Sequence, residues 1–206
     1  MAIVINGSGT VTGISVGGLP DGIVDSGTLA TNSVDSAELI DGSIDTAHIA
    51  ADQITGAILP AGTILQVQKS TIRTTQDTTS SATPAEVHSD YRVTITPRDT
   101  SSTILVMFFG DFYMAAENKM GLAMYRSVDG AAYAKVSPGD TGETFRNRGA
   151  GGDVEQISST VMHYDSPATT DVCIYTPYFY RPDGTAAVRI NDNGMGSFVV
   201  AMEVAG

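Results

Sequence analysis

Residues 104–109 read ILVMFF, which is the longest strongly apolar run in the chain. A short, unbroken apolar run of this kind is typical of a β-strand that is buried on both faces. It is far too short to span a bilayer, which takes about 20 apolar residues in a helix. We therefore expect an internal strand of a β-sheet and no membrane insertion.

Alternating patterns continue on both sides of this run. Residues 91–95 read YRVTI and residues 198–204 read FVVAMEV, and each has apolar residues at every second position. Further strand candidates, separated by turn residues, are 63–72, 120–127, 131–136, 154–163, 171–180 and 185–190. About nine strands without helical periodicity predict that residues 63–206 form an all-β head, a two-sheet β-sandwich resembling a jelly roll.

Turn residues place the connections of this head. Asp129-Gly130, Asp183-Gly184 and Asn193-Gly194 predict tight hairpins. The glycine-rich segment 138–153 is the longest non-strand stretch, and long loops on rigid scaffolds often bind ligands. The candidate receptor-contact residues in these loops are Arg146, Asn147, Arg148, Asn191 and Asn193.

Residues 14–62 have a different composition, without Lys, Arg or aromatic residues. A branched aliphatic residue occupies every fifth position, in a series formed by Ile14, Leu19, Val24, Leu29, Val34, Leu39, Ile44, Ile49, Ile54, Leu59 and Ile64. Five residues advance a helix by about 140° and turn a strand to its opposite face, so neither regular element places the series on one side. The backbone is therefore expected to bend within every repeat.

The same stretch also repeats at a period of ten, as VDSGTLATNS, VDSAELIDGS and IDTAHIAADQ. Asp25, Asp35 and Asp45 recur in register and predict caps for brief helical turns. A calcium loop is the weaker interpretation, because such a loop clusters its oxygen ligands within about a dozen residues. Flexible corners are expected at the glycines Gly22, Gly42, Gly56 and Gly62.

One aliphatic side chain in five cannot form a core within a single extended chain. Three chains wound together would place one apolar layer at every fifth residue. We therefore favour a homotrimeric stalk over residues 14–62, with the aliphatic series as its core. A single-chain pentapeptide β-solenoid is the alternative.

The charge of the chain restricts the ligands it can bind, and its cysteine content excludes an internal disulfide. The chain has 23 acidic and 11 basic side chains and a net charge of −12, which disfavours nucleic acid as a ligand. Its single cysteine, Cys173, lies in an apolar strand pattern and is expected to be a buried thiol without a disulfide partner.

No motif predicts catalysis. Residues 13–17, GISVG, match a nucleophile-elbow pattern, but they precede a repetitive stalk rather than a helix. His48, His88 and His163 lack metal-ligand spacing. We therefore predict a protein that is not an enzyme and has no catalytic, cofactor or metal site.

Several strings resemble tail-fibre proteins of tailed bacteriophages, particularly marine and cyanobacterial phages. They are GTVTGISVGGLPDG at 9–22, SIDTAHIAADQIT at 43–55, PAGTILQVQ at 60–68, TPRDTSSTILV at 96–106, DSPATTDVCIY at 165–175 and the closing SFVVAMEVAG. The resemblance implies a virion protein whose residues 1–13 dock to other virion proteins, while the head binds a host-surface receptor, possibly a glycan. Two further roles stay open, namely a purely structural capsid decoration or head fibre, and a small lyase or hydrolase acting on surface polysaccharide.

Overall fold

The structure is a computed structural model that describes residues 4–5, 11–12, 29, 31, 34, 39, 41–42, 44–45, 47–50, 54, 58–115, 118–136, 143–146, 154–183 and 186–206. The chain divides into two compact units, Met1–Gln53 and Ile54–Gly206. This division falls inside the segment that the sequence assigns to the stalk.

The described residues of the first unit form one strand pair and a series of turns and bends. Strand β1 (Val4–Ile5) pairs antiparallel with β2 (Val11–Thr12). Further along, the Asp45 carboxylate accepts a hydrogen bond from the Ala47 backbone N at 2.8 Å, and His48 N donates to Asp45 O at 3.1 Å. Asp45 therefore caps a brief turn, as predicted, whereas Asp25 and Asp35 lie outside the described residues.

Glycines make two of the expected corners. Gly42 has a φ of 81° and Gly62 has a φ of 89°, which is the left-handed region that glycine enters without a steric penalty. Gly22 and Gly56 lie outside the described residues.

Most of the described aliphatic series is exposed in the single chain. The exposed fraction runs from 39% at Ile49 to 55% at Ile64, and Leu59 is half-buried. The exposed members are Leu29, Val34, Leu39, Ile44, Ile49, Ile54 and Ile64. Ile14, Leu19 and Val24 lie outside the described residues.

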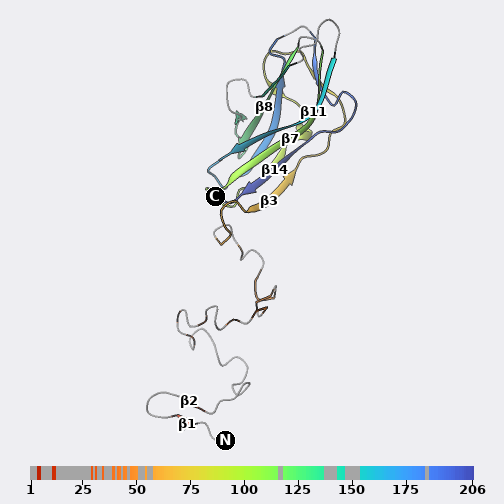
Figure 1. Cartoon of the computed structure of the whole chain (residues 1–206). Helices are drawn as coiled ribbons and strands as arrows, with labels where there is room; N and C mark the ends of the chain where they lie inside the picture. Colours follow the sequence, from red (N-terminus) through yellow and green to blue (C-terminus); the bar gives the residue numbers. More distant parts are fainter. Residues whose placement is uncertain are drawn as a thin grey trace. The chain divides into compact units, whose positions relative to one another are not determined.

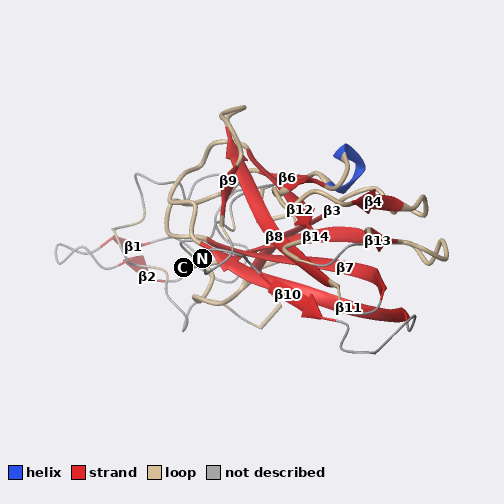
Figure 2. Ribbon diagram, turned by 90° about the horizontal axis from the view of Figure 1, so that it is seen from above, coloured by secondary structure: helices blue, strands red, loops and turns tan. Residues whose placement is uncertain are grey.

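The second unit is a sandwich of two antiparallel sheets (Figures 1 and 2). The β7 sheet contains β3 (Ile64–Lys69), β4 (Asp77–Thr79), β7 (Thr103–Ala115), β11 (Val154–Asp165), β13 (Val188–Ile190) and β14 (Phe198–Val204). The β12 sheet contains β5 (Ala85–Glu86), β6 (Val93–Ile95), β8 (Lys119–Val128), β9 (Ala134–Lys135), β10 (Glu143–Arg146) and β12 (Cys173–Tyr180). Among the described residues, the one helical element is the short 3-10 turn η1 (Ser89–Tyr91).

Strand β7 is the central strand of its sheet and pairs with three others. Strand β11 pairs along its whole length, and β14 and β13 pair end to end along its other edge, with β3 outside β14 and β4 outside β13. In the other sheet, β8 and β12 are central, β9 and β10 flank β8, and β5 and β6 flank β12. The chain passes repeatedly between the two sheets, which is a jelly-roll connection. The predicted all-β sandwich is therefore confirmed for the head.

The core lies between the sheets, and β7 shows how the sequence fills it. Ile104, Val106 and Phe108 are fully buried between the sheets, whereas Leu105 and Phe109 on the opposite face are half-buried. The prediction that residues 104–109 are buried on both faces is therefore confirmed for the inner face only, and the outer face is half-buried in the single chain.

Three turn dipeptides were predicted to close hairpins. One of them does so in the structure, and two do not. Asp129 and Gly130 have φ values of 47° and 75° and join the paired strands β8 and β9, as expected for a type I′ turn. Asn193-Gly194 does not close a hairpin, because β13 and β14 both pair with β7 rather than with each other. The strands on either side of Asp183-Gly184, β12 and β13, belong to different sheets and form no hairpin, and Gly184 itself lies outside the described residues.

Candidate functional site

The outer face of the β7 sheet is built from rows of cross-strand neighbours. The strand register brings one residue from each of two to four strands into every row, and paired residues share a face. We call the first four rows, counted from the Thr103 end of β7, the apolar face. They are Ile64, Val204 and Thr103, then Val67, Met202, Leu105 and Tyr164, then Lys69, Val200, Met107 and Met162, and finally Phe198, Phe109 and Thr160.

Several side chains of the apolar face are exposed in the single chain. Tyr164 is 65% exposed, and Val67 and Met162 are each 53% exposed. The fourth row is closed by an aromatic pair, since the rings of Phe109 and Phe198 are stacked with centroids 4.8 Å apart. Soluble monomeric proteins rarely expose a contiguous apolar patch of this kind, and large ones mark interaction surfaces.

The next two rows along β7 are polar. Asp111 lies opposite Ser158, and Tyr113 lies between Arg189 and Gln156. The Arg189 guanidinium sits 4.7 Å from the centroid of the Tyr113 ring. The outer face therefore changes from apolar to polar between Phe109 and Asp111.

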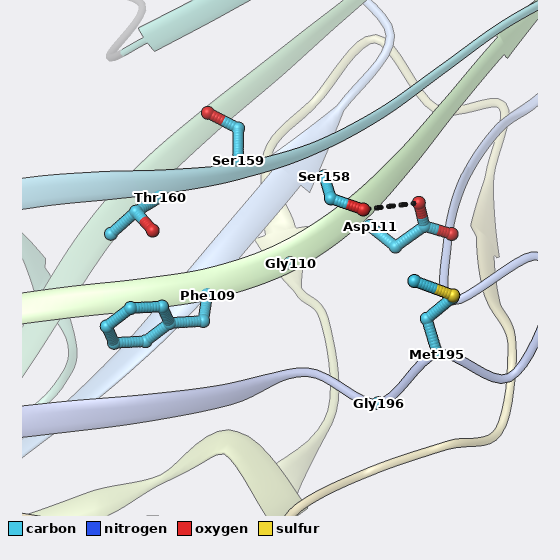
Figure 3. Close-up of a pocket in the computed structure, with 8 residues that line it drawn as sticks. All are labelled: Phe109, Gly110, Asp111, Ser158, Ser159, Thr160, Met195 and Gly196. Atoms are coloured by element: carbon cyan, nitrogen blue, oxygen red, sulfur yellow. Dashed lines mark hydrogen bonds between the residues drawn. The ribbon is translucent and has the colours of Figure 1, made fainter.

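A cavity of about 300 Å³ lies at this boundary (Figure 3). Its wall contains Phe109, Asp111, Ser158, Thr160 and Met195. Strands β7 and β11 supply most of the wall, and Met195 reaches it from the connection between β13 and β14.

Asp111 is the most deeply buried charged group in this wall, at 3% exposed. Its Oδ2 accepts a hydrogen bond from Gln156 Nε2 at 2.6 Å, and its Oδ1 accepts from Ser158 Oγ at 3.4 Å. Gln156 is held in turn by Asn193, whose Nδ2 donates to Gln156 Oε1 at 2.7 Å. The donors are neutral amide and hydroxyl groups, so the arrangement fixes neighbouring strands and offers acceptor oxygens to the cavity rather than a nucleophile.

Two of the predicted receptor-contact residues are described in full. Asn193 lies at the rim of the polar rows through its bond to Gln156. Asn191 is 1% exposed and has a φ of 59°. Its Nδ2 lies 2.8 Å from both Arg73 O and Tyr91 Oη, so it anchors the connection after β13 from inside.

The other predicted loop residues are described less fully. The prediction that Arg146 lies in a loop is wrong, because its backbone ends strand β10 and pairs with Lys119; Asn147 and Arg148 lie outside the described residues. Sequence reasoning missed the apolar face as a surface, although the signal was present in the ILVMFF run, which is more apolar than a strand with one wet face requires.

The histidines occupy separate places. His48 contacts Asp45, His88 accepts a hydrogen bond from Asp90 N at 3.1 Å as the cap of η1, and His163 is buried in β11. Within the described ranges, no group of three or more His, Cys, Asp or Glu side chains is arranged to hold a metal ion. In that same part of the chain, no helix has the length and apolar character needed to cross a bilayer.

Neither the known protein families nor the curated proteins contain a match to this sequence. Among solved structures, the head is similar to the Eiger TNF of S. frugiperda, with a TM-score of 0.43 and 8% identity over 68% of this chain and 92% of that one. A likeness at this level carries no argument about function.

Proposed function

We propose that this chain is the subunit of a homotrimeric fibre of a phage virion, and that its head attaches the particle to a receptor on the host surface. We propose a binding role, without catalysis by the chain itself. The observation that supports self-association is the exposed apolar face of the β7 sheet, because this face needs a cover that the single chain does not supply.

The composition of strand β7 supports self-association. A continuous apolar run is typical of strands covered on both faces, yet the single chain covers only the inner one completely. A second copy of the same chain would cover Leu105, Met107 and Phe109 and bury the exposed Met162 and Tyr164 beside them. Burial of apolar area stabilises such a contact by about 25 cal/mol per Å².

The distribution of charge also favours the apolar face as the contact between copies. The subunit carries a net charge of −12, so copies repel one another wherever acidic side chains meet. The apolar face contains no acidic residue, and Lys69 at its edge strand is its one charged member. Contact through this face therefore costs less electrostatic repulsion than contact through the acidic remainder of the surface.

The stalk series leads into this face. Ile64 is the last member of the five-residue series, and in the structure it begins β3, where it pairs with Val204 in the first row. Three chains that associate through the aliphatic series would bring Ile64, and with it the first row of the apolar face, into the same contact. This continuity favours one common assembly for both parts.

The assembly is tested by native mass spectrometry and light scattering on the full chain. We expect a particle of three times the 21.4 kDa subunit mass. The exposed Met162→Asp substitution should shift the population to single subunits without altering the circular dichroism spectrum. The matched control is Thr94→Asp, which places the same charge on an exposed residue of β6 in the other sheet and should leave the trimer intact.

A single subunit for the unmodified chain at micromolar concentration would contradict the homotrimer. Attachment is tested separately by binding of the labelled chain to cells that the particle infects. Particles that lose integrity without the protein, combined with no cell binding, would instead support a decoration role. Release of new reducing ends from host polysaccharide would contradict the non-catalytic role.

A further inference from the structure

The outer face of the β12 sheet carries three tyrosine rings, which we call the tyrosine platform: Tyr125 in β8, Tyr178 in β12, and Tyr133 immediately before β9. The rings of Tyr125 and Tyr178 are stacked with centroids 3.9 Å apart and an interplanar angle of 20°. The ring of Tyr133 lies 6.2 Å from that of Tyr178. All three side chains are half-buried, so they present ring surface to the solvent.

The strand register explains why these rings meet. Tyr178 lies opposite Ala123 and Tyr180 lies opposite Gly121, so large rings of β12 face small residues of β8. A Cβ atom at Gly121 would lie 2.1 Å from the Tyr180 ring, so the absence of a side chain there is required by the ring above it. Tyr125 lies next along β8, opposite Thr176, and its ring fills the space beside Tyr178.

A paired charge borders the platform. Arg92 Nε and Nη2 donate to the two carboxylate oxygens of Glu86, each at 2.7 Å, and Thr176 Oγ1 donates to Glu86 Oε1 at 2.9 Å. The Arg92 guanidinium lies 5.5 Å from the centroid of the Tyr133 ring. The bidentate geometry fixes both planar groups beside the rings.

These groups are suited to hydroxyl ligands. The two bonds to Glu86 use two of the five N–H donors of Arg92. Arg92 and Thr176 occupy both acceptor positions of Glu86 Oε1, whereas Oε2 accepts one bond and keeps a second position. Burial raises the pKa of Tyr133 and of Tyr178, so both phenols keep their protons at neutral pH and can donate hydrogen bonds. The platform thus combines aromatic ring surface with donors and acceptors at its margin.

We propose that the tyrosine platform, together with Arg92 and Glu86, binds a neutral pyranose unit of a glycan. The inference rests on the proposed attachment function and deepens it by naming the ligand class and its site. The C–H face of a pyranose is apolar and would lie on the rings, while its hydroxyl groups would exchange hydrogen bonds with the guanidinium and the carboxylate. Ligand sites commonly combine apolar and aromatic walls with a few fixed polar groups in this way.

Charge selects a neutral sugar over an acidic one. The charge of Arg92 is matched by Glu86 at its side, and the whole chain has a net charge of −12. An anionic sugar would therefore meet the repulsive field of an acidic chain, and the guanidinium beside the rings is already paired with a carboxylate. A neutral pyranose avoids that cost.

The position of the platform fits the assembly proposed above. It lies on the β12 sheet, on the opposite side of the sandwich from the apolar face of the β7 sheet. Copies that associate through the apolar face would leave their platforms open to solvent. Several platforms on one fibre would raise weak affinity at a single site into firm attachment.

The test is saturation-transfer difference NMR on the full chain with the methyl glycosides of glucose, galactose and mannose. We expect saturation of ring C–H protons in at least one of these glycosides, and at least about a fivefold loss of that signal in Tyr178→Ala and in Arg92→Leu. The matched control is Tyr113→Ala on the β7 sheet, which removes the same residue type from beneath another guanidinium, that of Arg189. This control should keep the full signal.

Circular dichroism establishes that the variants are folded, and Tyr133→Ala replaces Tyr178→Ala if the latter fails to fold. No saturation of any neutral glycoside would overturn the proposal, as would equal losses in Tyr178→Ala and Tyr113→Ala. Saturation of methyl glucuronide or of a proline-rich peptide in place of the neutral glycosides would also overturn it.

The outcome is separable from that of the attachment function. If the unmodified chain and Tyr178→Ala bind host cells equally well, the platform is not the receptor site and attachment stands. If the glycosides are saturated through the platform and no host cell is bound, the sugar site stands and attachment fails.

Discussion

Arg73 holds Asp77 through two parallel hydrogen bonds, from Nε to Oδ2 at 2.8 Å and from Nη2 to Oδ1 at 2.9 Å. The same guanidinium reaches Asp90 Oδ2 at 3.0 Å through Nη1, and the Tyr91 hydroxyl lies 3.3 Å from Asp77 Oδ2. The segment after β3, the edge strand β4 and the turn η1 are therefore joined around one guanidinium.

We predict that Arg73→Ala lowers the free energy of unfolding by about 3–5 kcal/mol, because it leaves the Asp77 carboxylate buried without a cation. Urea denaturation at one fixed protein concentration measures the change. Arg189→Ala is the matched control, since its pair with Asp192 is more exposed and should contribute less than about 1 kcal/mol. Equal losses in the two variants would show that the burial of Asp77 does not set the cost.

A second prediction concerns acid. Hydrogen bonding from Arg92 is the largest cause that lowers the pKa of Glu86 in the folded chain. A depressed carboxyl pKa contributes stability above the unfolded value of about 4.5, and that contribution is lost as the pH falls through the lower folded pKa.

Melting temperatures of the unmodified chain and Glu86→Gln at pH 6 and pH 3 test this prediction. We expect the unmodified chain to lose more stability than the variant between these pH values, with a difference of up to about 1 kcal/mol for this partly exposed pair. An identical pH response in the two proteins would exclude a contribution from Glu86.

A third prediction concerns Gly110 in the middle of β7. A Cβ atom at this position would lie 2.7 Å from Phe112 Cζ and 3.1 Å from Phe108 Cε1. The two buried rings already pack against each other, with centroids 5.9 Å apart. Gly110→Ala should therefore destabilise the head by about 1–3 kcal/mol through overpacking.

The companion double variant Gly110→Ala/Phe112→Leu removes the end of the nearest ring. It should lose less stability than the two single variants combined, because the clash and the ring are coupled. Strictly additive losses in thermal unfolding would argue against the clash as the cause.

A fourth prediction concerns the stalk and rests on the proposed homotrimer. Leu39 and Ile44 are 44% and 51% exposed in the single chain, so their apolar surface is available to other copies. Replacing both with Asn should raise the rate of proteolytic cleavage between residues 29 and 54 by at least about tenfold, since open segments are cleaved first. Asp41→Asn, an exposed neighbour outside the series, should be cleaved at the unmodified rate.

The alternation of apolar and polar residues predicted most of the strands of the head. The pattern at 198–204 matched β14, and the run at 104–109 fell inside the longer β7. The two-residue strand β5 and the three-residue strand β4 were not predicted, because so few residues are too short a segment to show an alternation of apolar and polar side chains.

Turn dipeptides were less informative than strand patterns. Asp129-Gly130 and Asn193-Gly194 are similar in sequence, yet just the first closes a hairpin. The pairing partner of a strand is set by the sheet as a whole, and here β7 is long enough to accept β13 and β14 in succession.

The two proposed binding surfaces depend on strand register, which could not be predicted from the sequence. Tyr125 and Tyr178 are distant along the chain, and their rings meet because β8 and β12 pair. Asn191 looked like a loop residue from its neighbours, and its burial became visible only with the partners Arg73 and Tyr91 in place.

Cys173 is fully buried in β12, and burial raises the pKa of its thiol, so the sulfur is both shielded and held as the weakly reactive S–H form. It is also the single cysteine of the sequence. The unmodified chain is therefore expected to react little with thiol-directed labels. A cysteine introduced at Met162 or at Thr94 would take up a maleimide dye or spin label selectively, so distances between the copies of the proposed assembly could be measured without first removing any native residue.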